Sequence, residues 1–140
     1  MREEILTIDV VIEECMEVKG KTGEAAMILF SGSVDCDAFH GKILPGGVDT
    51  QKKWNGESRS LSARYILEGT DYQGQPCRIF IENNGVMDST GSLEYTVPRI
   101  ITDSEALSYL EMEELIGTIT PTAQGVTIHI FRVLENDKVS

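Results

Sequence analysis

The sequence predicts an all-β fold: an antiparallel, closed or nearly closed barrel of about eight strands, with one short helix near residues 103–110. Apolar and polar residues alternate over many short segments, and this period of two is typical of strands with one buried face. Short turn-forming stretches separate the segments, and no strand–helix–strand repeat indicates a parallel sheet. Periodicity alone does not distinguish a barrel from a sandwich, but a barrel removes exposed strand edges and can hold one small ligand.

The first expected strand is long and bends. Its apolar residues Leu6, Ile8 and Val10 share one face, and the alternation slips at Glu13–Glu14 before Met16. Such a slip indicates a β-bulge, which bends a strand and helps a sheet to close. The stretch 19–23, with two glycines, is typical of a turn.

Seven further strands are expected along the chain. In the first of them, Gly32 marks a point where the strand kinks or another segment approaches closely. The seven expected strands cover residues 25–34, 39–44, 61–68, 77–83, the stretch from the turn at 84–85 to Val97, 115–120 and 126–134.

Turn chemistry predicts the connections between these strands. The segment after Pro45 is polar as far as Ser58 and is expected to form a loop. Asn84–Gly85 has the residues of a two-residue type I′ turn, because both central positions of that turn need a positive φ. Thr102 and Glu105 have the spacing of a capping box, which predicts the start of the short helix.

Length and composition indicate one domain that covers residues 1–140. Hydrophobic residues make up 41% of the chain and charged residues 25%, as is usual for a globular protein. The net charge of -11 repels phosphate backbones, so nucleic acid is not an expected partner. Five of the twelve basic residues nevertheless lie between positions 42 and 64, where they either form a solvated surface or attract a small anion: Lys42, Lys52, Lys53, Arg59 and Arg64.

Cysteine usage and hydropathy indicate a cytoplasmic protein without a membrane segment. Cys15, Cys36 and Cys77 are odd in number and widely spaced, which fits reduced thiols better than disulfides or a zinc site. The acidic start of the chain lacks the basic leader and the apolar run of a signal peptide. No window approaches the ~20 apolar residues of a membrane span.

Three separated motifs carry a family resemblance: GKILPGGVDTQ at 41–51, LSARYIL at 61–67 and IFIENNG at 79–85. In this order they resemble the family of small bacterial and fungal proteins called DUF3237 or UPF0311. The resemblance is strong over the middle third of the chain and extends to the ends only in their strand pattern. It implies a β-barrel and little about chemistry, since the family is named for its unknown function. A tryptophan often follows the motif aspartate in the family, whereas this chain has Thr50 there and Trp54 further on.

The loop after residue 44 is the first candidate for ligand contact. Gly46 and Gly47 allow backbone conformations closed to other residues, and free amides beside Asp49 would let a ligand approach closely. The alternative is a turn at the barrel rim in which Asp49 caps nearby amides. No strand-to-helix context surrounds the glycines, which excludes a P-loop and a dinucleotide-binding fingerprint.

The strand at 61–68 supplies Arg64 as a second candidate. Arg64 and Glu68 share one face, opposite the more apolar face that carries Tyr65 and Leu67. If the apolar face is the core, both charges point to solvent in a cross-strand charge ladder. If the lumen is polar, Arg64 anchors a carboxylate or an enolate through its planar fork of donors.

The neighbouring strand carries Asn83 and, on its opposite face, Glu82. Asn83 is either a turn former or a ligand contact. In a polar lumen, Asp49, Arg64 and either Asn83 or Glu82 converge as acid, electrostatic stabiliser and orienting group. The candidate ligand-binding residues are therefore Gly46, Gly47, Asp49, Arg64, Glu82 and Asn83.

No motif specifies a cofactor, a metal or covalent catalysis, and none of these is expected. His40 and His129 are far apart in sequence, and no ligand spacing demands a metal. The serines lack a nucleophile elbow, and no cysteine lies in an activating motif.

Three classes of function stay open at this point. The leading hypothesis is a barrel that binds a small, partly apolar or anionic molecule at one mouth. The second is a cofactor-independent isomerase or lyase in which Asp49 or Glu82 transfers a proton and Arg64 stabilises an oxyanion. The third is a protein-interaction module, and a homodimer is compatible with an exposed β surface.

Overall fold

The computed structural model describes residues 1–134, in which nine strands and one short helix form the regular structure. The strands are β1 (Arg2–Lys19), β2 (Gly23–Asp35), β3 (Phe39–Ile43), β4 (Val48–Trp54), β5 (Ser60–Asp71), β6 (Pro76–Val86), β7 (Val97–Thr102), β8 (Leu115–Pro121) and β9 (Gly125–Val133). Every strand pairing is antiparallel, so the predicted all-β class is confirmed.

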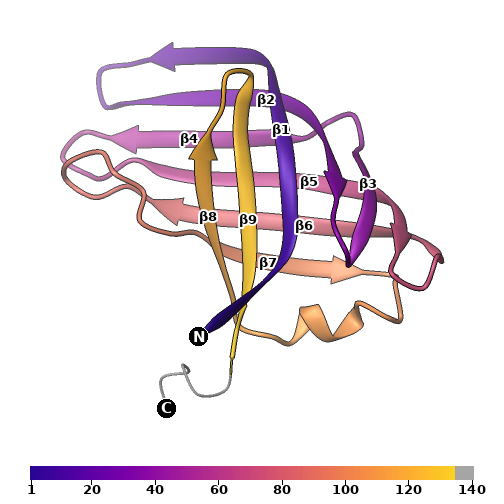
Figure 1. Ribbon diagram of the computed structural model, residues 1–140. Coiled ribbons are helices and arrows are strands. Elements are labelled where there is room, and N and C mark those ends of the chain that lie inside the picture. The colour runs from indigo at the N-terminus through magenta and orange to yellow at the C-terminus, as the bar shows by residue number, and fades with distance from the viewer. Residues whose placement is uncertain (135–140) are drawn as a thin grey trace.

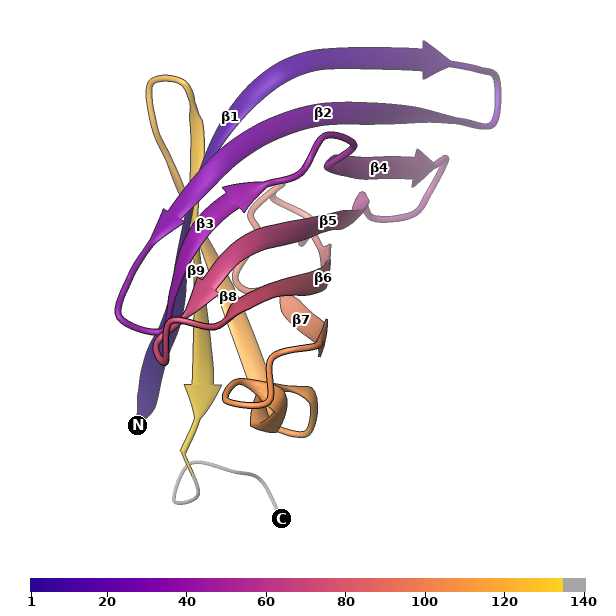
Figure 2. The same cartoon turned by 90° about the vertical axis from the view of Figure 1, so that its right-hand side faces the viewer.

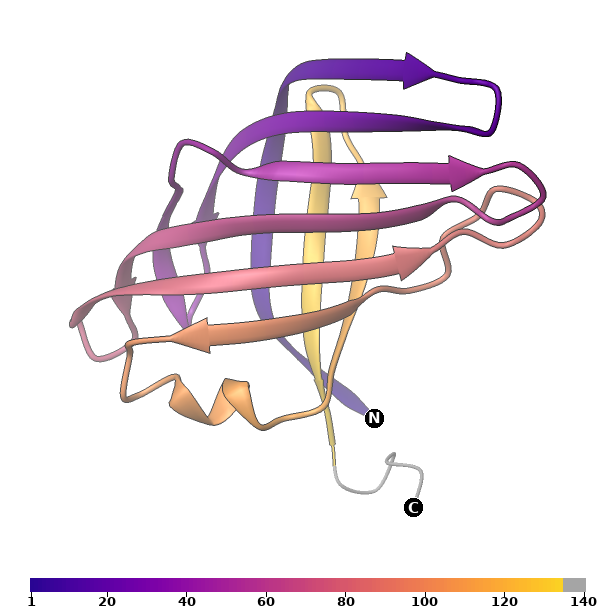
Figure 3. The ribbon, with the colours of Figure 1, turned by 180° about the vertical axis from the view of Figure 1, so that it is seen from behind.

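The strands form one curled sheet whose two ends meet (Figure 1, Figure 3). Its order is β7-β6-β5-β3-β2-β1-β9-β8, and β4 pairs with β2 and β5. The two ends of this order are joined at a bridge between Thr96, just before β7, and Gly117 of β8. These two residues exchange backbone hydrogen bonds with N···O distances of 2.8 and 2.9 Å. The nearly closed barrel is therefore confirmed, with nine strands in place of about eight.

The long strand β1 bends near its middle (Figure 1). Its first half pairs with β9 as far as Val11, and its second half continues beside β2 to Lys19. The register against β2 shifts between Ile12 and Glu14, which confirms the predicted bulge. Because a bulge lets a strand bend, β1 belongs to both sides of the barrel.

Strand β4 corrects the expected loop at 46–58. Val48–Trp54 pairs with β2 on one side and with β5 on the other. Two flanking strands satisfy the backbone groups of β4 whatever side chains it carries. The segment therefore forms a strand, although its polar residues are typical of a loop.

The predicted type I′ turn at Asn84–Gly85 is also wrong. Both residues lie inside β6, opposite Ser62 and Leu61 of β5, and neither has a positive φ. The chain reverses later, where the Asp88 carboxylate accepts the backbone N–H groups of Thr90 and Ser92 at 2.9 and 3.0 Å. The strand expected between this turn and Val97 is accordingly replaced by β7, which begins at Val97 and continues past Pro98.

The predicted helix is reduced to one 3₁₀ turn, η1 (Ser108–Glu111). Ser104 caps the preceding turn, because its Oγ accepts the Leu107 N–H at 3.1 Å and donates to Asp71 Oδ2 at 2.7 Å. Leu107 and Leu110 are fully buried in one cluster with Phe39 and Leu67, so this segment closes one end of the barrel. The capping residue is therefore Ser104 and not the predicted Thr102.

Large apolar side chains fill the barrel at this closed end. Phe39, Leu67, Ile79 and Ile130 have no exposed surface and belong to one cluster with Leu107 and Leu110. Figure 2 shows that β1, β2 and β4 extend away from η1. Within residues 1–134, no helix is long and apolar enough to cross a membrane.

Replacement of Gly32 tests the close contact between β1 and β2 that the sequence predicted. A Cβ at this position would lie 2.1 Å from the carbonyl oxygen of Asp9, so the two strands must separate to admit it. We expect Gly32→Ala to lower the free energy of unfolding by about 1–3 kcal/mol in urea denaturation, as in other overpacked sites. Gly20→Ala is the control, because the nearest atom to its Cβ would be 3.7 Å away. Equal stability of the two variants would contradict the close contact.

Candidate functional site

An apolar cavity of about 220 Å³ opens inside the barrel at the mouth opposite η1. It exceeds the ~150 Å³ of an apolar cavity that accommodates benzene and is smaller than the ~300–1,000 Å³ of pockets for drug-sized molecules. A molecule with one ring matches this volume. The walls are formed by Val10, Ile12, Ile28, Phe30, Asp49, Gln51, Leu61, Ala63, Asn83, Met87, Leu93, Ile119, Val126 and Ile128.

Two of the predicted site residues, Asp49 and Asn83, face each other across this cavity. Asp49 of β4 pairs with Ala63 of β5, and Ala63 pairs with Asn83 of β6, so the three side chains form one inward row. Adjacent strands lie about 4.8 Å apart, which places the backbones of Asp49 and Asn83 roughly 10 Å from each other. Because Ala63 contributes only a methyl group, the space between the two polar groups stays open.

The carboxylate of Asp49 has one satisfied and one unsatisfied oxygen. Oδ2 accepts the Gln51 side-chain amide at 2.9 Å, and the carboxylate also accepts the backbone N–H of Ser62. Oδ1 is buried without a hydrogen-bond partner in the described part of the chain. Burial raises the pKa of Asp49 above its ordinary value of 3.8, although the two hydrogen bonds oppose the shift. The site thus contains a carboxyl group that is easier to protonate than a surface aspartate.

A second group of buried oxygens lies at the seam where the barrel closes. Asn83 is 1% exposed and Thr96 is fully buried, and Asn83 Oδ1 and Thr96 Oγ1 have no hydrogen-bond partner within residues 1–134. A Cβ on Gly117 would lie 2.3 Å from Thr96 Oγ1 and 3.5 Å from Asn83 Oδ1, so both oxygens flank this glycine. A buried acceptor without a donor costs about 1–3 kcal/mol, which a donor on a bound molecule would recover.

Gly46 and Gly47 support the cavity without lining it. Gly47 accepts the backbone N–H of Phe30 at 3.0 Å, and a Cβ on Gly47 would lie 3.1 Å from the Phe30 ring. Gly46 is exposed and has a φ of 108°, a conformation that favours glycine. The two glycines therefore form a turn at the rim that lets Phe30 reach the cavity wall.

Arg64 and Glu82 lie on the outer surface of the barrel, which corrects the predicted convergence with Asp49. Arg64 Nε and Glu82 Oε2 are 3.1 Å apart, and the Arg64 side chain is 62% exposed. Further along the same two strands, Glu68 and Arg78 form a matching pair at 2.7 Å. The charge ladder is confirmed, and the interpretation of Arg64 as an anchor in the lumen is wrong. The reason is strand alternation: Arg64 follows the inward Ala63 and so points outward.

Three contributors to the cavity were missed from sequence. Gln51 was predicted to lie in a loop. It follows Asp49 by two residues, so both side chains point to the inner face of β4. Met87 and Leu93 belong to the β6–β7 connection and complete the cavity wall. They were missed because the sequence predicted the turn too early, at 84–85. Of the three, only Gln51 could have been predicted from the sequence, because its spacing of two residues from Asp49 is that of a strand face.

The histidines lie in separate surface contacts. His40 Nδ1 is 2.6 Å from Asp35, and His129 Nδ1 is 2.9 Å from Glu4. No cluster of three or more His, Cys, Asp or Glu side chains in the region 1–134 is arranged to hold a metal ion.

The raised pKa of Asp49 predicts a pH-dependent effect of Asp49→Asn on stability. The folded chain holds the Asp49 proton more tightly than the unfolded chain, so wild type loses stability relative to Asp49→Asn as the pH rises from 3.8 to the raised value. Above the raised pKa, the difference in the free energy of unfolding between wild type and Asp49→Asn is constant. Urea denaturation between about pH 3 and pH 8 measures it, with the exposed Asp37→Asn as control. A difference that stays flat or favours wild type as the pH rises would refute the raised pKa.

Comparison with known proteins gives a family and close structural matches. The family model described as "Protein of unknown function (DUF3237)" matches residues 3–133. A UPF0311 protein of Clostridium acetobutylicum is 33% identical over 87 residues, which are 60% of this chain and 52% of that protein. The chain thus spans about half the length of this curated relative.

Solved structures share the fold at low sequence identity. A protein of unknown function from Clostridium acetobutylicum superposes with a TM-score of 0.79 at 24% identity, covering 96% of this chain and 99% of that one. A β-barrel-like protein from Acinetobacter baumannii has a TM-score of 0.73 at 16% identity and covers 94% of both chains. A protein from Penicillium herquei, described as an enzyme, has a TM-score of 0.73 at 13% identity and covers 96% of this chain and 94% of its own.

Proposed function

The chain belongs to the DUF3237 family, and we propose that its barrel binds a one-ring molecule with a polar substituent in the cavity between Asp49 and Asn83. The observation that carries the proposal is the row Asp49–Ala63–Asn83, which places two polar groups with unsatisfied oxygens in an otherwise apolar hollow. Ligand pockets commonly combine an apolar wall with a few polar groups that fix orientation. A protein-interaction module needs no such hollow.

The chemistry of the two polar groups narrows the ligand class. Asp49 Oδ1 and Asn83 Oδ1 are acceptors, so they favour a hydroxyl or N–H donor on the ligand. The raised pKa of Asp49 brings its protonated form closer to neutral pH, and in that form Asp49 donates to a carbonyl. Phenols and cyclic alcohols meet the first requirement, and cyclic ketones meet the second.

A comparison of phenol with toluene tests the proposal. Both molecules fill the apolar space, but only phenol donates a hydrogen bond to Asp49. We expect calorimetric titration to show tighter binding of phenol than of toluene, and Asp49→Ala to weaken phenol binding about tenfold, the cost of roughly one hydrogen bond. Toluene binding should change little.

Two further variants locate the ligand. Ala63→Leu places three extra carbons in the middle of the row and should abolish the binding of both molecules. Ile66→Phe enlarges a side chain on the outer face of the same strand and should leave binding unchanged. Binding that survives Ala63→Leu would place the ligand elsewhere and refute the proposal.

The same site favours a second candidate function, proton transfer without a cofactor. Asp49 as carboxylate removes a proton from the carbon beside a carbonyl, the carbonyl oxygen takes up the charge, and the Asn83 amide N–H stabilises the resulting enolate. Return of the proton from Asp49 to another carbon completes an isomerisation. The raised pKa of Asp49 supports this candidate, as does the shared fold with the Penicillium herquei protein described as an enzyme.

Deuterium exchange tests proton transfer directly. With cyclohexanone in deuterated water, we expect the protein to accelerate exchange of the protons beside the carbonyl, as measured by proton NMR. Asp49→Asn should reduce this acceleration at least about 100-fold, because general acid–base groups contribute ~10²–10⁴-fold. Added phenol should inhibit the exchange, and Asp37→Asn should not affect it. Equal exchange by wild type and Asp49→Asn would exclude Asp49 as the base.

A further inference from the structure

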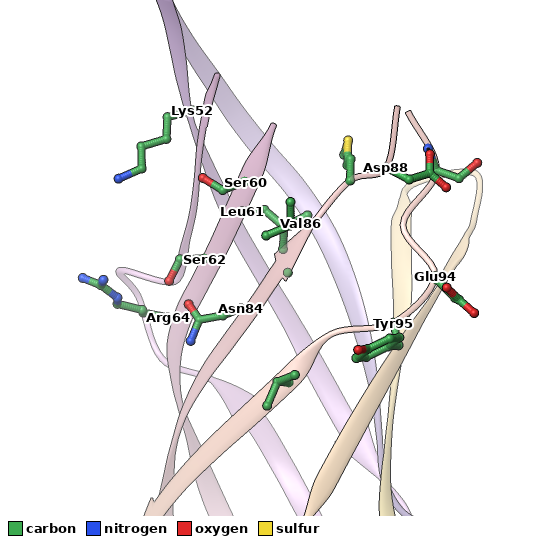
Figure 4. A pocket seen from close by; sticks show the side chains of 14 residues that line it. Lys52, Ser60, Leu61, Ser62, Arg64, Asn84, Val86, Asp88, Glu94 and Tyr95 are labelled. Atoms are coloured by element: carbon green, nitrogen blue, oxygen red, sulfur yellow. The ribbon is translucent and has the colours of Figure 1, made fainter. Parts of the chain in front are cut away.

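A second hollow, the outer groove, lies on the outside of the barrel wall (Figure 4). It has a volume of about 750 Å³ and is formed by β4, β5, β6 and the segment that connects β6 to β7. Ser60, Ser62, Arg64 and Asn84, which point outward, line it, whereas Ala63 and Asn83 point into the cavity; Leu61 and Met87 line both hollows. The outer groove and the cavity therefore lie on opposite faces of the same strands and present different side chains.

One side of the outer groove is cationic. Lys52 of β4 and Arg64 of β5 both line it, and the outward side chains Ser60 and Ser62 precede Arg64 on β5. Figure 4 shows Lys52, Ser62, Arg64 and Asn84 on the same side of the strands. Two of the five basic residues clustered in the sequence thus line the same groove, four residues apart along neighbouring strands.

The hydrogen-bonding capacity of this side is only partly used. Arg64 pairs with Glu82, with Nε and Oε2 3.1 Å apart. Lys52 forms no ion pair with any residue between 1 and 134. Ser62 Oγ is buried and likewise lacks a hydrogen-bond partner in that range. Over the whole groove, the charges of Lys52 and Arg64 are balanced by those of Asp88 and Glu94 on the opposite side.

The opposite side of the outer groove is apolar at its centre. Val86, Tyr95 and Val97 are 64%, 52% and 48% exposed, and all three line the groove. Asp88 and Glu94 stand at the edge of this side and repel an anion there. A bound anion is therefore held against Arg64 and Lys52, with any apolar part directed toward Tyr95.

We propose that the outer groove is a second binding site, for a small organic carboxylate with an aromatic or aliphatic body. The terminal nitrogens of Arg64 and the Lys52 ammonium bind the carboxylate, and the Ser62 hydroxyl donates to it. The planar fork of arginine matches a carboxylate. Val86, Tyr95 and Val97 contact the body of the molecule. This site is independent of the function proposed for the cavity.

Titration with benzoate, followed by amide chemical shifts in a ¹⁵N-labelled sample, tests the site. We expect the largest shifts at Ser62, Asn84 and Val97. Arg64→Gln and Lys52→Gln should each weaken benzoate binding at least about tenfold, as expected for loss of a charge-assisted hydrogen bond. Arg78→Gln is the matched control, because Arg78 forms the corresponding pair with Glu68 on the same two strands but lies outside the groove.

Two results would overturn the outer groove as a carboxylate site. One is equal weakening by Arg64→Gln and Arg78→Gln, which would show general attraction to positive charge. The other is loss of benzoate binding in Ala63→Leu with unchanged binding in Arg64→Gln, which would place the anion in the cavity. If inorganic phosphate bound as tightly as benzoate, the apolar side of the groove would contribute nothing to binding, and the proposed contact with an aromatic or aliphatic body would be wrong. Failure of phenol to bind the cavity affects only the function proposed there.

Discussion

The alternation of side chains between the two faces of a curled sheet is the constraint on which the rest of the structure depends. Each strand presents every second residue to an interior of limited volume, so the size of the inward residues decides where the barrel is filled. Near η1 these residues are large, as Leu67 and Ile79 are, and the interior is solid. At the other mouth the inward residue Ala63 is small, and a cavity remains.

The same alternation places different chemistry on the two sides of one wall. Ala63 and Arg64 are neighbours in the chain, yet one lines an apolar cavity and the other a cationic groove. Asn83 and Glu82 are divided in the same way. Residues that are adjacent in a sequence motif therefore need not serve one site, and the motifs of this chain supply two surfaces.

Much of the fold could be predicted from the sequence because it depends on local periodicity. The bend of β1 followed from the phase slip at Glu13–Glu14, and the hairpin of β8 and β9 followed from its turn residues. Strand β4 could not be recognised, because its pairing partners stabilise it and its own residues are polar. Asp49 and Asn83 were identified as candidates, but only the register shows that they share a row and that Arg64 does not.

The bridge between Thr96 and Gly117 is a shorter joint than the strand pairing of β5 with β6. β5 and β6 are paired from Ser60 to Thr70, whereas the joint before β7 depends on the two hydrogen bonds of one residue pair. Local openings of a folded protein occur where the fewest contacts must be lost. We therefore expect this joint to open before the long strand pairings do, which would bring water to the buried amide of Asn83, next to Gly117.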